Sequence, residues 1–152
     1  MSVELLGLAA GCFLVGALLG LPVLRLSIFR YPSAAAAAVG SVLLVGAATY
    51  MLAGDRLSVG LPVSTPLGGF EIAGTALGGL FLLVIGVVGF AIAVYSSDYV
   101  IHVGGPPRQA ALLVFFNLTL GSLAAIVVAG NALTFLLAWE AMSILTLSLI
   151  HI

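Results

Sequence analysis

Five long apolar stretches follow one another along the chain, and they restrict its fold more than any other feature. Each is about as long as the roughly 20 residues that an α-helix needs to cross the hydrocarbon core of a bilayer. They cover residues 3–24, 33–53, 72–95, 109–129 and 131–152. Charged residues make up only 6% of the chain, whereas soluble domains contain about 25%. So few charges cannot form a surface that faces water, and we expect an integral membrane protein.

The apolar stretches are continuous and do not alternate with polar residues, which favours helices over a transmembrane barrel. The connection at 54–71 differs, because Pro62, Pro66 and the Gly68-Gly69 pair interrupt any helix there. Short extended runs at 58–63 and 69–72 predict a small hairpin at the outer surface. The predicted fold is therefore a single all-α membrane domain over residues 1–152, with about five transmembrane helices and one outer β-hairpin between the second and third.

The arginines predict how this domain is oriented. Arg25 and Arg30 flank the first connection, Arg56 lies in the second and Arg108 ends the third. Cytoplasmic connections of membrane proteins carry the excess of Lys and Arg. An N-terminus outside puts three of these four arginines on the cytoplasmic side. We therefore expect a multi-pass protein of the inner, or plasma, membrane with its N-terminus outside.

Several classes of function are not supported by the composition. There is no basic patch of the kind that nucleic acid binding requires, and no nucleotide-binding glycine motif. The single Cys12 cannot form a disulfide or hold an iron–sulfur cluster within the chain. His102 and His151 lie far apart in sequence, so we predict no metal site and no cofactor.

Small residues recur four positions apart in the first stretch, as Gly7 and Gly11 and then as Gly16 and Gly20. Such spacings place small residues on one helix face and allow neighbouring helices to approach closely. We expect generic close packing there, not a dedicated dimer motif.

Glu140 is the one acid that the sequence places deep in an apolar stretch. It lies nine residues beyond Asn131, which is about 14 Å into a hydrocarbon core about 30 Å thick. A charged carboxylate costs at least about 2.5–3.5 kcal/mol at that depth, and such residues are usually functional. We expect its side chain to be held within protein, where the proton is exchangeable. A purely structural role, as a protonated hydrogen-bonding group or a counter-charge to an arginine, is the alternative.

Four other residues are candidates to support this carboxylate. Trp139 is equally deep, and a buried indole N–H needs a partner, so we expect a protein-facing side chain that packs beside the acid. Ser143 lies on nearly the same helix face, Asn117 lies midway along the fourth stretch, and His151 ends the fifth. Ser143 and Asn117 are more simply explained by local or interhelical hydrogen bonds than by a proton relay.

The last stretch is similar to a known transmembrane helix. Residues 131–150, NALTFLLAWEAMSILTLSLI, resemble the fifth helix of the antiporter-like subunits shared by respiratory complex I, Mrp-type cation/proton antiporters and membrane-bound hydrogenases. The shared hallmark is an aromatic–Glu pair, here Trp139-Glu140. Residues 61–99 resemble the outer hairpin and third helix of that family, most closely in the hydrogenase-4 component B/formate hydrogenlyase subunit 3 branch. The sequence departs from the family at residues 75–78, which read Thr-Ala-Leu-Gly where Asp-x-Leu-Ser is common.

The resemblance implies a proton-translocating subunit of a hydrogenase or NADH:quinone oxidoreductase complex. In that family the glutamate pairs with a lysine on the seventh helix, and Glu140 takes the position of this glutamate. The chain has no lysine, so the resemblance implies the N-terminal part of a longer subunit. The expected partners are other membrane and peripheral subunits of a respiratory or hydrogenase complex, which would carry the redox centres. Whether the ion is H⁺ or Na⁺ stays open.

Two other functions compete with this interpretation. The chain can be a non-transporting membrane anchor or assembly subunit, in which Glu140 only holds two helices together. It can also be a small solute transporter, although many such folds contain repeated halves. Five stretches without an internal repeat argue against the transporter.

Overall fold

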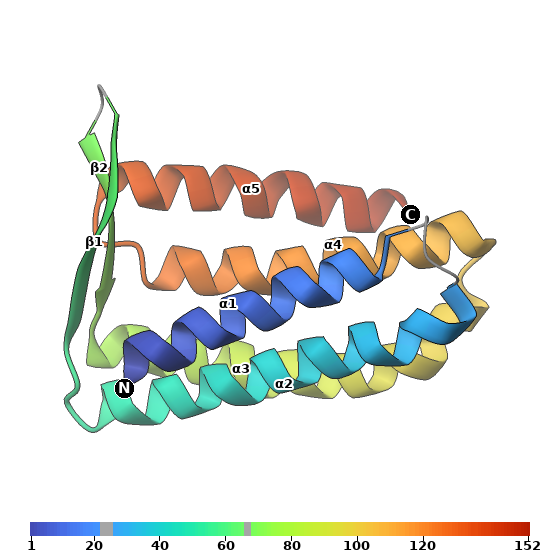
Figure 1. The fold of residues 1–152 in the computed structure, drawn as a ribbon, viewed down its shortest axis with the longest axis horizontal. Helices are drawn as coiled ribbons and strands as arrows, with labels where there is room; N and C mark the ends of the chain where they lie inside the picture. The colour runs from blue at the N-terminus through green and yellow to red at the C-terminus, as the bar shows by residue number, and fades with distance from the viewer. Residues whose placement is uncertain (22–25, 66–67) are drawn as a thin grey trace.

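The computed structural model describes residues 1–21, 26–65 and 68–152. Long helices lie side by side in this structure, and a two-stranded hairpin stands across one end of them (Figure 1). The elements in chain order are α1 (Ser2–Leu19), α2 (Leu26–Leu52), β1 (Leu57–Thr65), β2 (Gly68–Gly74), α3 (Ala76–Tyr99), the 3₁₀ turn η1 (Val100–His102), α4 (Pro106–Val127) and α5 (Ala132–His151). Within the described residues, five helices are long and apolar enough to cross a membrane. The predicted helical class and helix number are confirmed to that extent.

The helix boundaries differ from the predicted stretches at two places. The second helix begins at Leu26 and continues through Pro32, so the stretch predicted at 33–53 starts too late. The third was predicted at 72–95, but residues up to Gly74 belong to β2 and α3 runs on to Tyr99. Thr75 separates strand from helix, because its hydroxyl caps α3 by accepting the Gly78 N–H at 3.1 Å.

The other helix ends agree more closely with the sequence. The fourth and fifth helices each begin and end within three residues of their predicted stretches, at Pro106–Val127 and Ala132–His151. The first helix ends at Leu19. Residues 22–24 of the first predicted stretch lie outside the described residues.

The predicted hairpin is present and is joined to the connection between α4 and α5. Strands β1 and β2 pair antiparallel, and the turn predicted between them falls on residues 66–67, outside the described part. On its other edge β2 bonds to that connection: the Ala73 N–H donates to the Val128 carbonyl at 2.8 Å, and the Gly130 N–H donates to the Glu71 carbonyl at 2.7 Å. The hairpin therefore fixes the point at which α5 starts.

Glycines allow close contacts between the helices, but only one of the two glycine pairs predicted in the first stretch makes such a contact. Gly16 and Gly20 lie against α4, with the side chains of Asn117 and Leu113 beside them. Gly7 and Gly11 have the same spacing, yet a Cβ at either would meet nothing within 4 Å. The prediction of close packing is confirmed for the second pair and wrong for the first. The reason is that α1 meets α4 near its C-terminal end and diverges from it towards the N-terminus (Figure 1).

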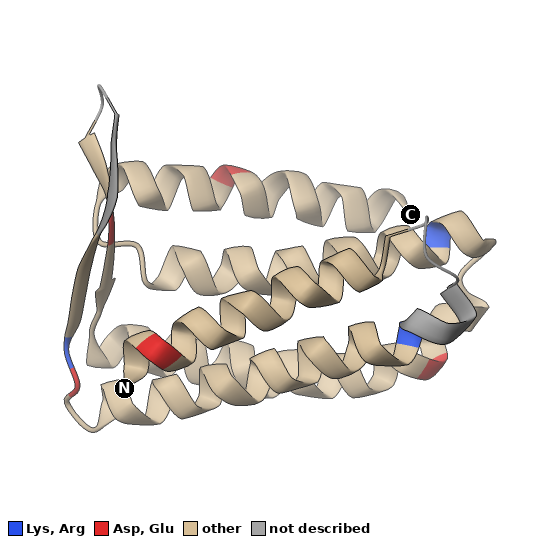
Figure 2. Ribbon diagram, viewed as in Figure 1, with Lys and Arg blue, Asp and Glu red and all other residues tan. Residues whose placement is uncertain are grey.

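Charged residues gather towards the two ends of the helix bundle, apart from an acidic turn along α5 (Figure 2). The N-terminus and the hairpin share one end, and the C-terminus lies at the other (Figure 1). This arrangement agrees with an odd number of crossings.

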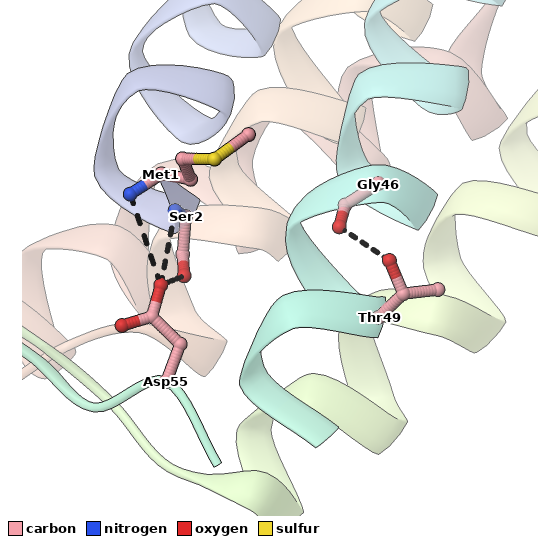
Figure 3. A network of polar contacts seen from close by, with 5 residues as sticks. All are labelled: Met1, Ser2, Gly46, Thr49 and Asp55. Carbon is pink, nitrogen blue, oxygen red and sulfur yellow. Dashed lines mark hydrogen bonds and ion pairs between the residues drawn. The ribbon is translucent and has the colours of Figure 1, made fainter. Parts of the chain in front are cut away.

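At the hairpin end, Asp55 caps the first helix (Figure 3). Its Oδ2 accepts the Ser2 hydroxyl and, at 3.3 Å, the Ser2 backbone N–H, and the terminal ammonium lies 3.8 Å away. The first amides of a helix lack partners within the helix, and a carboxylate there also interacts favourably with the helix dipole. Thr49, drawn nearby, donates instead to the Gly46 carbonyl of its own helix at 2.7 Å.

The contact with Ser2 predicts a pH-dependent stability. The pKa of Asp55 lies below its ordinary value of 3.8, first because the Ser2 hydroxyl and then because the Ser2 backbone N–H donates to the carboxylate. A carboxyl group whose pKa is lower in the folded than in the unfolded state stabilises the fold when the pH is above its unfolded-state pKa. This stabilisation disappears as the pH falls through the folded-state pKa. We expect Asp55→Asn to lower the thermal midpoint at pH 7 by a few degrees at most, and we expect the difference to shrink progressively as the pH falls below about 4.

Thermal unfolding in detergent micelles at pH 7, 5 and 3 measures this effect. Asp98→Asn, an exposed acid at the far end of α3, is the matched control and should leave the midpoint unchanged. A difference between wild type and Asp55→Asn that does not shrink between pH 5 and pH 3 would contradict the role of the ionised carboxylate.

Candidate functional site

The start of α5 is held by a set of polar contacts with β2. Asn131 caps the helix: its Oδ1 accepts both the backbone N–H and the hydroxyl of Thr134 at 2.9 Å. The Asn131 amide donates to the Gly69 carbonyl at 2.7 Å, and the Glu71 N–H donates to the Thr134 hydroxyl at 3.0 Å. The two bonds between α5 and β2 join residues more than 60 positions apart. They fix both the depth and the rotation of α5, and hence the direction in which Glu140 points.

The rotation of α5 directs Glu140 away from its neighbour. The principal contacts of α5 are with α4 and β2. Ala138, Met142 and Leu149 are half-buried on the covered side. Glu140 lies two residues beyond Ala138, which is about 200° around the helix. The carboxylate therefore belongs to the opposite, uncovered side.

This position differs from the one expected from the sequence. Glu140 is the ninth residue of α5, about midway along the helix as predicted, but its side chain is exposed and is not held among the other helices. Among the residues that the structure describes, none forms a hydrogen bond or ion pair with it. The physical reason is that α5 is the outermost helix of the bundle, and none of its residues is buried.

Trp139 was likewise expected to face protein, and this prediction is wrong for the described chain. Its side chain is 48% exposed, and its ring contacts Phe135 on the preceding turn, with ring centroids 5.7 Å apart. The Ser143 hydroxyl donates to the Trp139 carbonyl at 2.9 Å. The simpler interpretation of Ser143, a hydroxyl bonded to its own helix, is confirmed.

His151 shares the uncovered side with the acid. It lies eleven positions beyond Glu140, which is about 20° around the helix and about 16 Å along it. Ile144 and Leu147 lie between them on the same side, and all four side chains are exposed. We call Glu140, Ile144, Leu147 and His151 the uncovered α5 stripe. It presents one acid and one imidazole in an otherwise apolar surface.

Asn117 lies elsewhere, buried in a joint between α1, α2 and α4. Its amide donates to the Leu113 carbonyl at 3.0 Å and to the Ser33 hydroxyl at 3.3 Å. The Ser33 hydroxyl donates in turn to the Gly16 carbonyl at 2.7 Å. We call Gly16, Ser33 and Asn117 the polar joint. It links three helices, and Asn117 and Ser33 are fully buried in it.

One atom of the polar joint has no partner. Asn117 Oδ1 is buried without a hydrogen bond in the described residues. It lies against Gly16, where a Cβ would overlap with Oδ1 and lie 2.7 Å from Cγ. The absence of a side chain at Gly16 is therefore what makes room for the asparagine.

Asn117 was a candidate from the sequence, but its partners in the polar joint, Gly16 and Ser33, were not. Ser33 stands at the start of an alanine run and Gly16 in a common spacing, so neither is conspicuous alone. Only the three positions taken together could have indicated the contact. A small residue in the first stretch and a hydroxyl in the second lie at depths in the membrane that an asparagine in the fourth can reach. Glu140 and Asn117 are not brought together by the described helices.

No metal centre is formed by the described part of the chain, which contains no cluster of three or more His, Cys, Asp and Glu side chains. Comparison of the chain with family models and with curated proteins finds no match. The site is therefore defined by its own geometry: a mid-helix acid on the uncovered side of α5, separate from the buried polar joint of α1, α2 and α4.

Proposed function

We propose that the chain forms the N-terminal, five-helix part of a proton-translocating, antiporter-like subunit of a hydrogenase or NADH:quinone oxidoreductase complex, with its N-terminus outside the membrane. One observation carries this proposal: Glu140 lies midway along an apolar helix, on a side that no described residue covers. The similarity of residues 131–150 to the fifth helix of that family gives the acid its role.

An uncovered carboxylate at this depth needs a partner. Facing hydrocarbon, its charged form is unfavourable by at least about 2.5–3.5 kcal/mol. A further helix that carries a cation would cover the stripe and stabilise the charge, whereas withdrawal of the cation would favour protonation. Glu140 then takes up a proton when the cation moves away and releases it when the cation returns. Electron transfer in the partner subunits would drive that movement.

The hairpin supports a docked partner on this side. Strands β1 and β2 extend past α5 on the side away from α4 (Figure 1). A helix packed on the stripe would therefore lie beneath the hairpin. In this proposal, the same helix covers α5 and brings the cation that pairs with Glu140.

A non-transporting anchor subunit is the second candidate, and a specific observation favours it. The hydroxyls along α4 and α5 are bonded to their own helices: Thr119 donates to the Phe115 carbonyl at 2.7 Å, and Ser148 donates to the Ile144 carbonyl at 2.8 Å. Such hydroxyls are not arranged as a continuous relay within this chain. In the anchor, Glu140 would only hold a partner helix in place.

Proton pumping by native membranes tests the choice. Everted vesicles from cells with the gene intact or deleted receive NADH, formate or H₂ in turn, and acidification of the lumen is followed with a fluorescent dye. We expect one donor to drive acidification that is lost on deletion and returns on complementation. Turnover of the complex with an artificial electron acceptor measures how much complex is assembled. If the chain is only an anchor, acidification should depend on that amount alone.

A further inference from the structure

An apolar cavity lies between the first helix, the fourth helix and the hairpin. Its volume is about 270 Å³. An engineered apolar cavity of about 150 Å³ stays dry and binds benzene, so this cavity has room for a larger hydrocarbon. Its walls come from α1, α2, α4 and both strands, and its lining side chains are apolar throughout.

The cavity exists because α1 diverges from α4 where small residues face each other. Gly7 and Ala10 line it from α1, and Gly121, Ala124 and Ala125 line it from α4. A Cβ at Gly7 would meet nothing within 4 Å. Larger residues at these positions would fill the space, so the sequence keeps it open.

The shape of the cavity matches one half of a bilayer. Its wall on α1 runs from Val3 to Phe13, ten residues or about 15 Å along the helix. One leaflet of a hydrocarbon core about 30 Å thick has the same depth. Leu57 and Ile72 of the hairpin line the cavity as well, at the end of the bundle where lipid headgroups would lie.

The cavity opens to the outside of the bundle along α1. Val3, Gly7 and Ala10 are exposed, whereas Phe13 and Leu44 at its inner wall are only 2% and 1% exposed. In a membrane, what surrounds those exposed residues is lipid hydrocarbon. A chain of the adjoining lipid can therefore enter sideways and replace empty space with contacts to the lining side chains.

We propose that this cavity is a binding site for one acyl chain of a phospholipid in the leaflet on the hairpin side. The inference rests on the proposed membrane location but not on proton translocation. The bound chain would occupy the space between α1 and α4 and support the hairpin, which holds the start of α5.

Photolabelling tests the site. The full-length protein is isolated from its native membranes and reconstituted with a phosphatidylethanolamine that carries a diazirine in its acyl chain, irradiated and mapped by mass spectrometry. We expect label on Phe13 and Leu44, which lipid outside the cavity cannot reach. Label on Val84 and Val88, exposed residues of α3, reports insertion into the bilayer in the same sample.

Two phenylalanine variants one turn apart provide the comparison. Gly7→Phe fills the cavity and should abolish label on Leu44 and Phe13. Gly11→Phe is the matched control, because Gly11 also has open space around it but does not line the cavity, and it should leave the label unchanged. Label on Val84 without label on Leu44 in the wild type would overturn the lipid site. So would a Gly7→Phe protein that keeps the label. Absence of label everywhere would overturn the membrane location itself, and the site with it.

Discussion

We expect Glu140→Gln to abolish proton translocation and to leave the complex assembled. Glutamine preserves the size and hydrogen-bonding capacity of the side chain but cannot take up or release a proton. The side chain makes no hydrogen bond or ion pair to the described residues, so its replacement removes nothing from the five-helix fold itself. Proton movement in everted vesicles, normalised to the amount of complex on native gels, measures the effect.

Two further substitutions make this result specific to the carboxyl group. Glu140→Asp keeps the titratable group on a side chain one methylene shorter and should retain part of the flux. Glu4→Gln removes an exposed acid near the start of α1 and should pump like the wild type. If Glu140→Gln pumps normally, proton transfer through this residue is excluded. If it fails to assemble, the anchor function is favoured.

The helices were predictable because each depends on its own sequence. A run of about 20 apolar residues must satisfy its backbone internally, whatever it packs against. The hairpin was predictable for a similar reason, since Pro62 and the Gly68-Gly69 pair interrupt a helix locally. The start of the second helix was not predictable in this way. Helix α2 begins six residues before Pro32, so the apolar stretch predicted the membrane-spanning part of the helix but not its first residues.

The surroundings of Glu140 were not predictable, because they depend on contacts between distant residues. Its depth followed from counting along the chain, but its direction is set by the bonds of Asn131 to Gly69 and of Thr134 to Glu71. A helix that is apolar on all sides carries no pattern to say which side is covered. The deep position of Trp139 was therefore misleading, since depth in the membrane does not specify burial in protein.

The two glycine pairs of α1 make the same point. Gly7 and Gly11 have the same spacing as Gly16 and Gly20, yet only the second pair meets α4. The inclination of α1 decides between them. That inclination follows from the polar joint at one end and from the contact of Asp55 with Ser2 at the other, neither of which a search within one helix can find.

Among changes to stability, we expect the largest from Gly16→Ala. A Cβ at Gly16 would overlap with Asn117 Oδ1 and lie 2.7 Å from Cγ, inside a joint whose other members are fully buried. Overpacking of this kind costs about 1–3 kcal/mol. In a chain of this size, each kcal/mol lowers the thermal midpoint by about 2–4 °C. Gly11→Ala is the matched control: its Cβ has open space, and alanine favours a helix over glycine by about 0.5–1 kcal/mol, so the midpoint should not fall.

A double-mutant cycle with Asn117→Ala then tests whether the two residues act as one contact. Asn117→Ala alone removes the bonds to Ser33 and the Leu113 carbonyl, and hydrogen bonds between membrane helices contribute on average about 0.6 kcal/mol each. It also removes the atoms that a Cβ at Gly16 would strike. The double variant should therefore be more stable than the sum of the single costs predicts, by about 0.5–3 kcal/mol. Strictly additive costs would show that Gly16 and Asn117 do not touch. The three-helix joint would then fail as the explanation for the inclination of α1, and so for the cavity beside it.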